Sequence, residues 1–511
     1  MRALGTPDPD ADSDIAALAA AATDLREAAE QAFSRMAGAP LVAGNRLRLL
    51  TDVRAHFDAW LEAIRGARRK IHLESYIFAD DAVGREFAEA LAAKAREGVR
   101  VRVVYDWLGG LGTTSSRLVR AMTAAGIEVR AFNPFRFASP FGWLARDHRK
   151  SLVVDGALAS VTGICLSARW LGDPGRGVPP WRDTGVMIEG PAVADLERAF
   201  AEAWAACGAP LPREDLTPRR AIAAAGDAAL RVIATVPNTA AIYRLDQLVA
   251  SLARERLWLA DAYFVGTPAY VQTLRAAAAD GVDVRLLVPG ASDVPVISPL
   301  SRAGYRPLLE AGVRVFEWNG SMMHAKTAVA DGRWARVGST NLNIASWLGN
   351  WELDVAIDDE RFGAEMEAAY EGDLANATEI VLRERSHVRL RSPRRAALPH
   401  RGPRGSAGRA AAGALRLGNV VGAALGARRV LGPAESRLML AAAVLAFAVA
   451  LLLFFYPRVI AYPLAVVAAW VAVTLVIQAR RLHGDGRARS RRKRPPRRNR
   501  PPPELGPPER E

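Results

Sequence analysis

The feature of this sequence that most restricts its fold is a nine-residue pattern that occurs twice. Residues 148–156 read HRKSLVVDG and residues 324–332 read HAKTAVADG, so His, Lys and an Asp-Gly pair recur at the same offsets. The chain is otherwise poor in two of these residue types, with 7 His and, among its 68 basic residues, only five Lys. Chance spacing does not account for such a repeat, which predicts two structurally related halves.

The segments that precede each copy also correspond. Before both motifs, short runs rich in β-branched residues alternate with Ala-rich helical segments that end at Gly, in the order strand, helix, strand, helix, strand, motif. This alternation is typical of βαβ units and predicts an α/β fold. The boundary between the two repeats is expected within residues 211–228.

Each motif places its two basic groups on one side of an extended strand. His324 and Lys326 are two residues apart, so their side chains project from the same face, and the Asp-Gly pair after them predicts a hairpin turn. An imidazole can attack phosphorus or move a proton, and an ammonium group beside it stabilises phosphate charge. Gly338, Ser339 and Asn341 return toward the same end and could hold phosphate oxygens. The pattern therefore indicates phosphate-ester chemistry.

With these residues the chain resembles the phospholipase D superfamily, whose signature is His-x-Lys-x4-Asp-x6-Gly-Ser/Gly-x-Asn, present twice per active site. The resemblance covers about residues 41–385, and the stretches RDHRKSLVVDG, WRDTGVMIEGPAV and NWELDVAI are most similar to bacterial cardiolipin synthases. It implies that two phospholipase D-like βαβ-type repeats meet about a pseudo-twofold axis and form one catalytic unit. It implies no metal and no other cofactor.

The resemblance also implies roles for the histidines and for two carboxylates. His148 would attack the phosphodiester, and His324 would protonate the leaving alcohol and deprotonate the incoming one. The residues by themselves leave the reverse assignment of the two histidines open. Asp183 in WRDT and Glu352 in NWEL stand where the family has a carboxylate that orients each histidine.

The remaining motif residues are expected at the phosphate or at the turns. Asp155 and Asp331 begin the two turns, with either a catalytic or a structural role. The residues expected to hold the phosphate during catalysis are Lys150, Lys326, Gly163, Ser339 and Asn341.

The first copy departs from the family pattern after its hairpin. It reads Thr162-Gly163-Ile164-Cys165, and Cys165 replaces an amide donor with a weak thiol donor. Losing one of several donors to an oxyanion can cost an enzyme roughly 10²-fold in rate, but the nucleophile and the acid remain. The first copy is therefore expected to be weakened or compensated rather than inactive.

The net charge of +14 is not spread evenly along the chain. Residues 1–385 hold 44 basic and 49 acidic residues, a net charge of −5, whereas 386–436 carry +9 and 479–500 carry +10. A nucleic-acid enzyme would carry its basic charge on the folded domain. Basic clusters that flank apolar runs instead predict attraction to anionic lipid headgroups.

Two uncharged runs of 19 residues, 438–456 and 459–477, are separated only by Pro457 and Arg458. At about 1.5 Å per residue each run is long enough to cross the ~30 Å hydrocarbon core of a bilayer. Neither has a polar stripe, which argues against the alternative of a buried hairpin in a soluble domain. Arg437 and Arg480 at the outer ends predict that both ends, and so the catalytic unit, lie on the cytoplasmic face of a bacterial inner membrane.

An aromatic-rich stretch before the first motif is a second candidate for membrane contact. Phe132, Phe135, Phe137, Phe141 and Trp143 are interleaved with Pro and Gly just before the first motif. Such a loop either enters the bilayer interface at the mouth of the site or packs as an aromatic cluster in the core.

The predicted organisation has seven segments. In chain order they are a helical segment 1–40, a first repeat 41–210, a linker 211–228, a second repeat 229–385, a basic linker 386–436, a transmembrane helical hairpin 437–478 and a basic disordered tail 479–511.

The leading functional hypothesis is a phosphatidyltransferase that converts two phosphatidylglycerols to cardiolipin and glycerol through a phosphohistidine. Its partners would be phosphatidylglycerol and other anionic phospholipids in the membrane, with no nucleic acid. Three alternatives remain: a phospholipase D that hydrolyses phospholipid to phosphatidic acid, a nuclease of the same superfamily, and a non-catalytic lipid-binding protein. The −5 charge of residues 1–385 disfavours the nuclease.

Overall fold

The computed structural model describes residues 28–135, 144–294, 297–382 and 388–390, together with eight single positions between 444 and 473. The chain divides into two compact units, Met1–Pro134 with Trp143–Leu440 and Phe135–Gly142 with Ala441–Glu511. In the part that is described, no helix is both long and apolar enough to cross a bilayer. Apart from those eight positions, the predicted spans 438–456 and 459–477 lie outside the described residues, as do residues 1–27, most of the predicted basic linker and the predicted tail.

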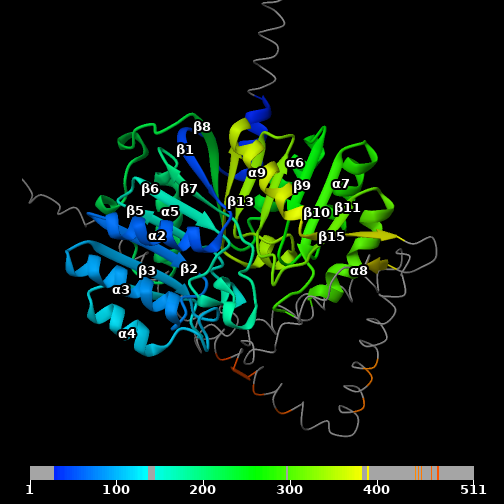
Figure 1. Ribbon diagram of the computed structural model, residues 1–511. Helices are drawn as coiled ribbons and strands as arrows, with labels where there is room; N and C mark the ends of the chain where they lie inside the picture. The colour runs from blue at the N-terminus through cyan, green and yellow to red at the C-terminus, as the bar shows by residue number, and fades with distance from the viewer. Residues whose placement is uncertain are drawn as a thin grey trace, which may run out of the picture. The chain divides into compact units, whose positions relative to one another are not determined.

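The first unit contains two halves of matching topology (Figure 1). The elements of the first half are β1 (Val42–Leu50), α2 (Val53–Gly66), β2 (Lys70–Ser75), α3 (Ala82–Arg96), β3 (Arg100–Asp106), α4 (Ser116–Ala124), β4 (Glu128–Phe132), β5 (Ser151–Val154), β6 (Leu158–Thr162), β7 (Gly185–Glu189) and α5 (Val193–Ala206).

The second half repeats this series after a linker that contains only short 3-10 turns. Its elements are β8 (Ala228–Thr235), α6 (Ala241–Leu252), β9 (Arg256–Ala260), α7 (Pro268–Ala279), β10 (Asp283–Pro289), α8 (Ile297–Glu310), β11 (Arg314–Trp318), β12 (Thr327–Ala330), β13 (Trp334–Gly338), β14 (Glu352–Asp358), α9 (Glu360–Leu374), β15 (Ala377–Leu382) and β16 (Val388–Leu390).

All sixteen of these strands form one mixed sheet, in the order β16-β15-β11-β10-β9-β12-β13-β14-β8-β1-β7-β6-β5-β2-β3-β4. Antiparallel pairing of β1 with β8 joins the halves at the centre, and the strand order outward from that seam is equivalent on both sides. The two-half α/β architecture predicted from the duplicated sequence is therefore confirmed.

The expectation of βαβ units holds for only three strands of each half. Strands β2, β3 and β4 are parallel, as are β9, β10 and β11. The motif hairpins β5–β6 and β12–β13 run antiparallel to their neighbours. The reason is the three-residue connection that begins with Asp-Gly, which reverses the chain and is too short for the crossover that parallel strands need.

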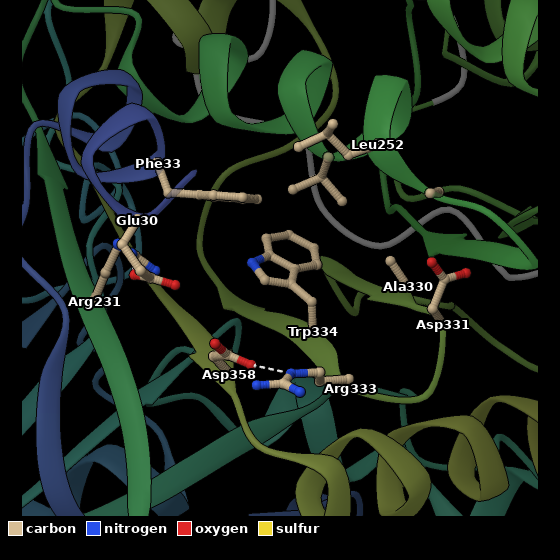
Figure 2. A pocket seen from close by; sticks show the side chains of 11 residues that line it. Glu30, Phe33, Arg231, Leu252, Ala330, Asp331, Arg333, Trp334 and Asp358 are labelled. Carbon is tan, nitrogen blue, oxygen red and sulfur yellow. Dashed lines mark hydrogen bonds and ion pairs between the residues drawn. The ribbon is translucent and has the colours of Figure 1, made fainter. Parts of the chain in front are cut away.

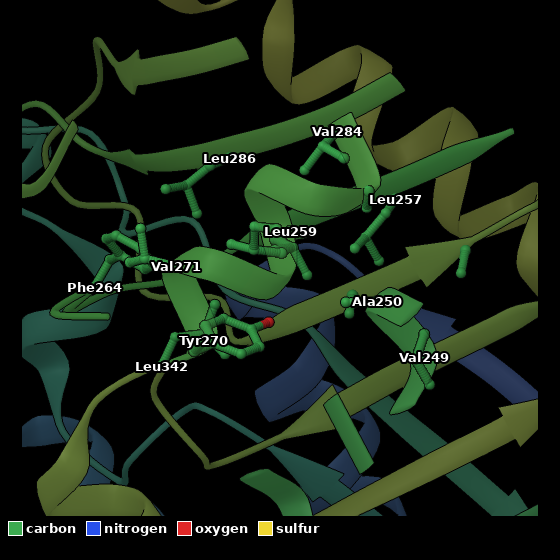
Figure 3. Close-up of a cluster of buried hydrophobic side chains, with 14 of the residues drawn as sticks. Val249, Ala250, Leu257, Leu259, Phe264, Tyr270, Val271, Val284, Leu286 and Leu342 are labelled. Carbon is green, nitrogen blue, oxygen red and sulfur yellow. The ribbon is translucent and has the colours of Figure 1, made fainter. Parts of the chain in front are cut away.

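Helices cover both faces of the sheet. On one face, α6 and α7 pack on β9 and β10 around Leu257, Leu259 and Tyr270 (Figure 3), and α2 and α3 form an equivalent cluster on the first half. On the other face, α5 and α9 pack against apolar side chains from the strands of both halves. Because both faces are buried, strands such as β2 and β12 have no exposed residue, as expected of a doubly covered sheet.

A helix at residues 28–37 precedes β1 and packs on the second half, where Glu30 pairs with Arg231 and Phe33 contacts the core. Phe132, one of the five aromatics before the first motif, is also buried in a core cluster, with Phe200 and Trp204. The core alternative therefore applies to Phe132, whereas residues 136–143 lie outside the described residues.

Candidate active site

Both motif histidines stand at the start of a hairpin, at the same edge of the sheet. His148 and Lys150 come directly before and at the start of the first hairpin, where Ser151 of β5 pairs with Glu74 near the end of β2. His324 and Lys326 precede β12, where Thr327 pairs with Ala260 at the end of β9. Since β5 and β12 are antiparallel to these strands, each motif begins at the carboxyl end of the parallel strands, where α/β sheets bind their ligands.

Each histidine is oriented by a carboxylate from the opposite half. His148 Nδ1 lies 2.8 Å from Glu352 Oε2, and His324 Nδ1 lies 2.7 Å from Asp183 Oδ2. All four side chains are buried or nearly so. The two halves thus complete each other's histidine, and neither half holds a complete pair alone.

Two short backbone bridges between the halves bring each histidine to the carboxylate of the opposite half. Asp147 pairs in parallel with Trp351, one residue before Glu352, and Arg182, one residue before Asp183, pairs with Met323. The amide of His148 donates to the Trp351 carbonyl at 2.9 Å, and the amide of His324 donates to the Arg182 carbonyl at 2.7 Å. The main chain of each histidine is therefore anchored beside the carboxylate that its ring contacts.

Charge and burial set the protonation of the four groups. Burial lowers the pKa of His148 and of His324 to about 4, although Glu352 and Asp183 oppose the effect. Burial alone would raise the pKa values of Glu352 and Asp183, but the facing histidines and Lys150 or Lys326 outweigh it and hold both below their ordinary values. At neutral pH both carboxylates are ionised and both imidazoles neutral, with Nδ1–H donating to the carboxylate and Nε2 left as a free base.

The two lysines supply positive charge at the same place. Lys326 Nζ lies 3.1 Å from His324 Nδ1 and 3.3 Å from Nε2, and both lysines donate to the carbonyl of their own motif histidine. Burial, followed by the charge of Lys150, lowers the pKa of Lys326 to about 8, although Asp183 opposes the effect. The charges of the two lysines therefore act on each other, and an anionic group between them, such as a phosphodiester, would stabilise both.

The small residues after the hairpins lie against the carboxylates. A Cβ atom on Gly163 would fall 2.4 Å from Asp183 Oδ1, so only glycine fits there. At the equivalent position Ser339 donates from its hydroxyl to Glu352 Oε2 at 2.6 Å. These two residues therefore contact the histidine-orienting carboxylates, a role that the phosphate-binding prediction did not include.

Cys165 and Asn341 occupy equivalent positions, and both are buried. Burial raises the pKa of the Cys165 thiol, which keeps it protonated at neutral pH. The Oδ1 atom of Asn341 is buried without a hydrogen-bond partner among the described residues. The second half therefore keeps a polar amide at this point, and the first half offers only the thiol.

Asp155 and Asp331 lie at the opposite ends of their hairpins from the histidines. Both have positive φ angles, 56° and 51°, and each is followed by a glycine with positive φ, as the two central residues of a type I′ turn require. The carboxylate of Asp331 accepts three backbone N–H groups at the start of β9, each at 2.9 Å, and Asp155 does the same for β2. These contacts support the structural alternative for both aspartates.

Sequence reasoning missed Arg149, which lies between His148 and Lys150 in the first motif. Its side chain is fully buried on the face opposite His148 and Lys150. Its guanidinium donates to three main-chain carbonyls, those of Glu352 at 3.2 Å, Ala199 at 2.8 Å and Thr235 at 3.0 Å. The alternation of a strand predicted the opposite face, but not that the guanidinium would tie β14 and β8 of the second half to the first motif.

The described residues contain no group of three or more His, Cys, Asp and Glu side chains that could hold a metal ion. The chemistry available to the site is that of two imidazoles, two carboxylates and two lysines.

The chain that carries this site is similar to known proteins of one family. The family model described as "Cardiolipin synthase, PLD-like domain" matches residues 60–204 and 249–374. The chain is 34% identical over 368 residues to cardiolipin synthase A of Pseudomonas aeruginosa, covering 70% of this chain and 73% of that protein. It is 30% identical over 365 residues to cardiolipin synthase 1 of Bacillus anthracis, covering 68% and 70%.

Among solved structures, phosphatidylserine synthase of Haemophilus influenzae has the same fold, with a TM-score of 0.56 at 14% sequence identity. The match covers 68% of this chain and 91% of that one.

Proposed function

The chain belongs to the cardiolipin synthase family of phospholipase D-like proteins, and from this premise we propose that it transfers a phosphatidyl group from one phosphatidylglycerol to another. The products are cardiolipin and glycerol. The observation that carries the proposal is the pair of histidine–carboxylate contacts formed across the halves, beside two lysines. One phosphodiester between them would meet a nucleophile, an acid and two cations at once.

We assign His148 as the nucleophile. Its Nε2 attacks the phosphorus of the first phosphatidylglycerol, a P–N bond forms, and the P–O bond to glycerol breaks as His324 gives that oxygen a proton. In the second step the hydroxyl of another phosphatidylglycerol gives its proton to His324 and attacks the phosphorus, and the P–N bond breaks. Glu352 accepts the Nδ1–H of His148 throughout and stabilises the positive charge of the phosphorylated ring.

The acid step needs a proton on His324, whose pKa is lowered to about 4, chiefly by burial and then by Lys326. A bound phosphodiester brings a negative charge beside that ring and neutralises the repulsion from Lys326. Both effects raise the pKa of His324 in the substrate complex. The site is therefore tuned to acquire its catalytic proton together with the substrate.

Product analysis tests the proposal directly. Purified protein would be incubated with labelled phosphatidylglycerol in mixed micelles, and the lipid products resolved. We expect cardiolipin and free glycerol in equal amounts. Phosphatidic acid as the only product would mean that the protein is a hydrolase, and no conversion at all would reject phosphatidylglycerol as the substrate.

Like the family to which it belongs, the protein is associated with membranes, and we propose that residues 437–478 form its anchor, with the catalytic unit on the cytoplasmic side. The support is the pair of 19-residue uncharged runs between basic segments. Within those runs six of the described large apolar side chains are exposed, from 41% at Leu451 to 68% at Val466, as lipid-facing side chains are in the absence of lipid, whereas Trp470 is half-buried. In the same unit the ring of Phe135, from the aromatic stretch, lies 6.1 Å from that of Trp470.

Truncation after residue 436 is expected to release the protein from vesicles. With vesicles of phosphatidylglycerol and a zwitterionic lipid, the full chain should float with the lipid in 1 M salt, because apolar insertion does not depend on charge, whereas electrostatic binding is screened within about 3 Å at that salt. The truncated chain should remain in the dense fractions. Release of the full chain by salt alone would contradict the anchor and point to the basic segments.

A further inference from the structure

The two active-site histidines differ in what surrounds them. Trp170, Trp181 and Tyr263 lie around His324, with ring centroids 5.4, 5.5 and 5.8 Å from that of the imidazole. Among the described residues, His148 has a single aromatic ring at such a distance, Tyr76 at 5.2 Å. The side chain of His324 is 5% exposed and that of His148 is 12% exposed. His324 is thus the more enclosed of the two imidazoles.

The three rings around His324, Trp170, Trp181 and Tyr263, form an aromatic wall that belongs to both halves. Trp170 and Trp181 come from the loop between β6 and β7 of the first half, and their main chains are joined by a 2.9 Å hydrogen bond from Trp181 to Trp170. Ser321, three residues before His324, donates its hydroxyl to the Pro179 carbonyl of that loop at 2.8 Å. The loop that carries Trp170 and Trp181 is therefore bonded to the segment that leads into His324.

Polar groups stand beside the aromatic wall. Tyr263 donates its hydroxyl to Asp293 Oδ1 at 2.7 Å, and Arg169 Nη1 lies 3.9 Å from Asp293 Oδ2. Burial is the main cause of the lowered pKa of His324, and the negative charge of Asp293 is among the groups that oppose it, which places this carboxylate within electrostatic reach of the ring. The indole N–H of the buried Trp170 has no hydrogen-bond partner among the described residues.

We infer that the aromatic wall and Asp293 form a subsite for the glycerol headgroup and exclude water from His324, and so determine whether the intermediate undergoes transfer or hydrolysis. The inference rests on the proposed function. Aromatic rings bury the carbon atoms of a polyol, and a carboxylate and an N–H group bind its hydroxyls. The leaving and the incoming groups are both glycerol moieties, so one subsite beside the acid and base serves both half-reactions.

The two fates of the intermediate differ only in the oxygen that attacks. In both, the P–N bond to His148 breaks, a P–O bond forms, and the proton of the attacking hydroxyl goes to His324. A phosphatidylglycerol hydroxyl gives cardiolipin, whereas water gives phosphatidic acid. Water is small and abundant, so transfer requires that the space at His324 be closed to it until a glycerol group fills it.

Trp181→Ala is the direct test, with the ratio of phosphatidic acid to cardiolipin as the readout. Only folded protein forms either product, so the ratio of the two products does not depend on the fraction of the variant that is folded. We expect it to rise about tenfold, the discrimination that one pocket contact typically supplies. Trp181→Phe, which keeps a ring in place, should stay close to the wild-type ratio.

Asp293→Asn provides a second, nearly isosteric variant. It removes the charged acceptor for the glycerol hydroxyls, so the same ratio should rise while the concentration of phosphatidylglycerol needed for half-maximal transfer also increases. Unchanged ratios in Trp181→Ala and Asp293→Asn would overturn the inference and leave the synthase activity standing. A wild-type protein that makes no cardiolipin would overturn both.

The matched control is Trp334→Ala. Trp334 begins β13 at the turn end of its hairpin, away from the histidines, and lines a cavity of about 210 Å³ with Phe33 and Leu252 (Figure 2). Removing this indole changes packing but no group near His324. The product ratio of this variant should equal that of the wild type, and a rise there would show that the ratio responds to general loosening of the fold, which would also overturn the inference.

Discussion

His148→Ala and His324→Ala should each reduce cardiolipin formation by about 10²-fold or more, but only one of them should abolish covalent chemistry. Without His148 no phosphohistidine can form with any donor. Without His324 the glycerol oxygen leaves unprotonated, which costs about 10²- to 10⁴-fold for an alkoxide. A donor whose leaving group is a nitrophenolate needs no such proton, so His324→Ala should still release nitrophenol in a burst and His148→Ala should not.

The measurement is a rapid-mixing assay with a nitrophenyl phosphatidyl ester, together with recovery of labelled phospholipid on the denatured protein under alkaline conditions, in which a P–N bond survives. His72→Ala serves as the control, because His72 is also a buried histidine but is stacked on Phe200, with ring centroids 4.6 Å apart, outside the site. A burst in His148→Ala with none in His324→Ala would reverse the two assignments.

Glu352→Gln should lower kcat by about 10²- to 10⁴-fold with little change in the folded structure. Gln has the same size and can still contact Ser339 and Asn350, which donate to the carboxylate at 2.6 and 3.2 Å. It loses the charge that stabilises the phosphorylated imidazole. Its amide can also donate to Nδ1, which moves the ring proton to Nε2 and removes the lone pair that attacks phosphorus.

Asp183→Asn is the matched partner of this variant, because Asp183 contacts His324 in the way that Glu352 contacts His148. With the nitrophenyl donor, Glu352→Gln should suppress the burst and Asp183→Asn should leave it. The thermal unfolding midpoint of each variant would be measured together with its rate of nitrophenol release, so that a loss of folded protein is distinguished from a loss of catalysis. Equal bursts in the two variants would mean that the carboxylates are structural and do not control the tautomer of the histidines.

The sequence was a sufficient guide wherever the relevant contacts are local. The two-residue spacing of His and Lys on a strand, the reversal at Asp-Gly and the order of strands and helices all follow from short-range geometry. The structure agrees with the spacing, the reversal and the alternation of strands and helices, but each half has one more helix and one more strand before its motif than the predicted order contains. The comparisons agree with the family that the motifs indicated. The same spacing placed Asp155 and Asp331 in the motif. Their carboxylates accept backbone N–H groups at the turn ends of the hairpins, away from the histidines, and this structural role accounts for them without a catalytic one.

The linear sequence was insufficient where two halves had to meet. Asp183 and Glu352 were expected to orient a histidine each, yet nothing in the chain says which carboxylate serves which ring. His148 and Glu352 are 204 residues apart, and Asp183 and His324 are 141 apart. Their pairing depends on the β1–β8 seam and on the bridges at Trp351 and Arg182, which no local pattern encodes.

By itself, then, the sequence determined the duplicated α/β halves, the motif hairpins and which motif side chains share a face, because spacing along a strand or helix decides the face on which a residue lies. Only the tertiary structure decided that each half completes the other's histidine, that Arg149 ties them together from behind, and that His324 alone is walled by Trp170, Trp181 and Tyr263. These contacts join residues far apart in the chain, and they exist only because burial of both sheet faces holds the two halves at one seam.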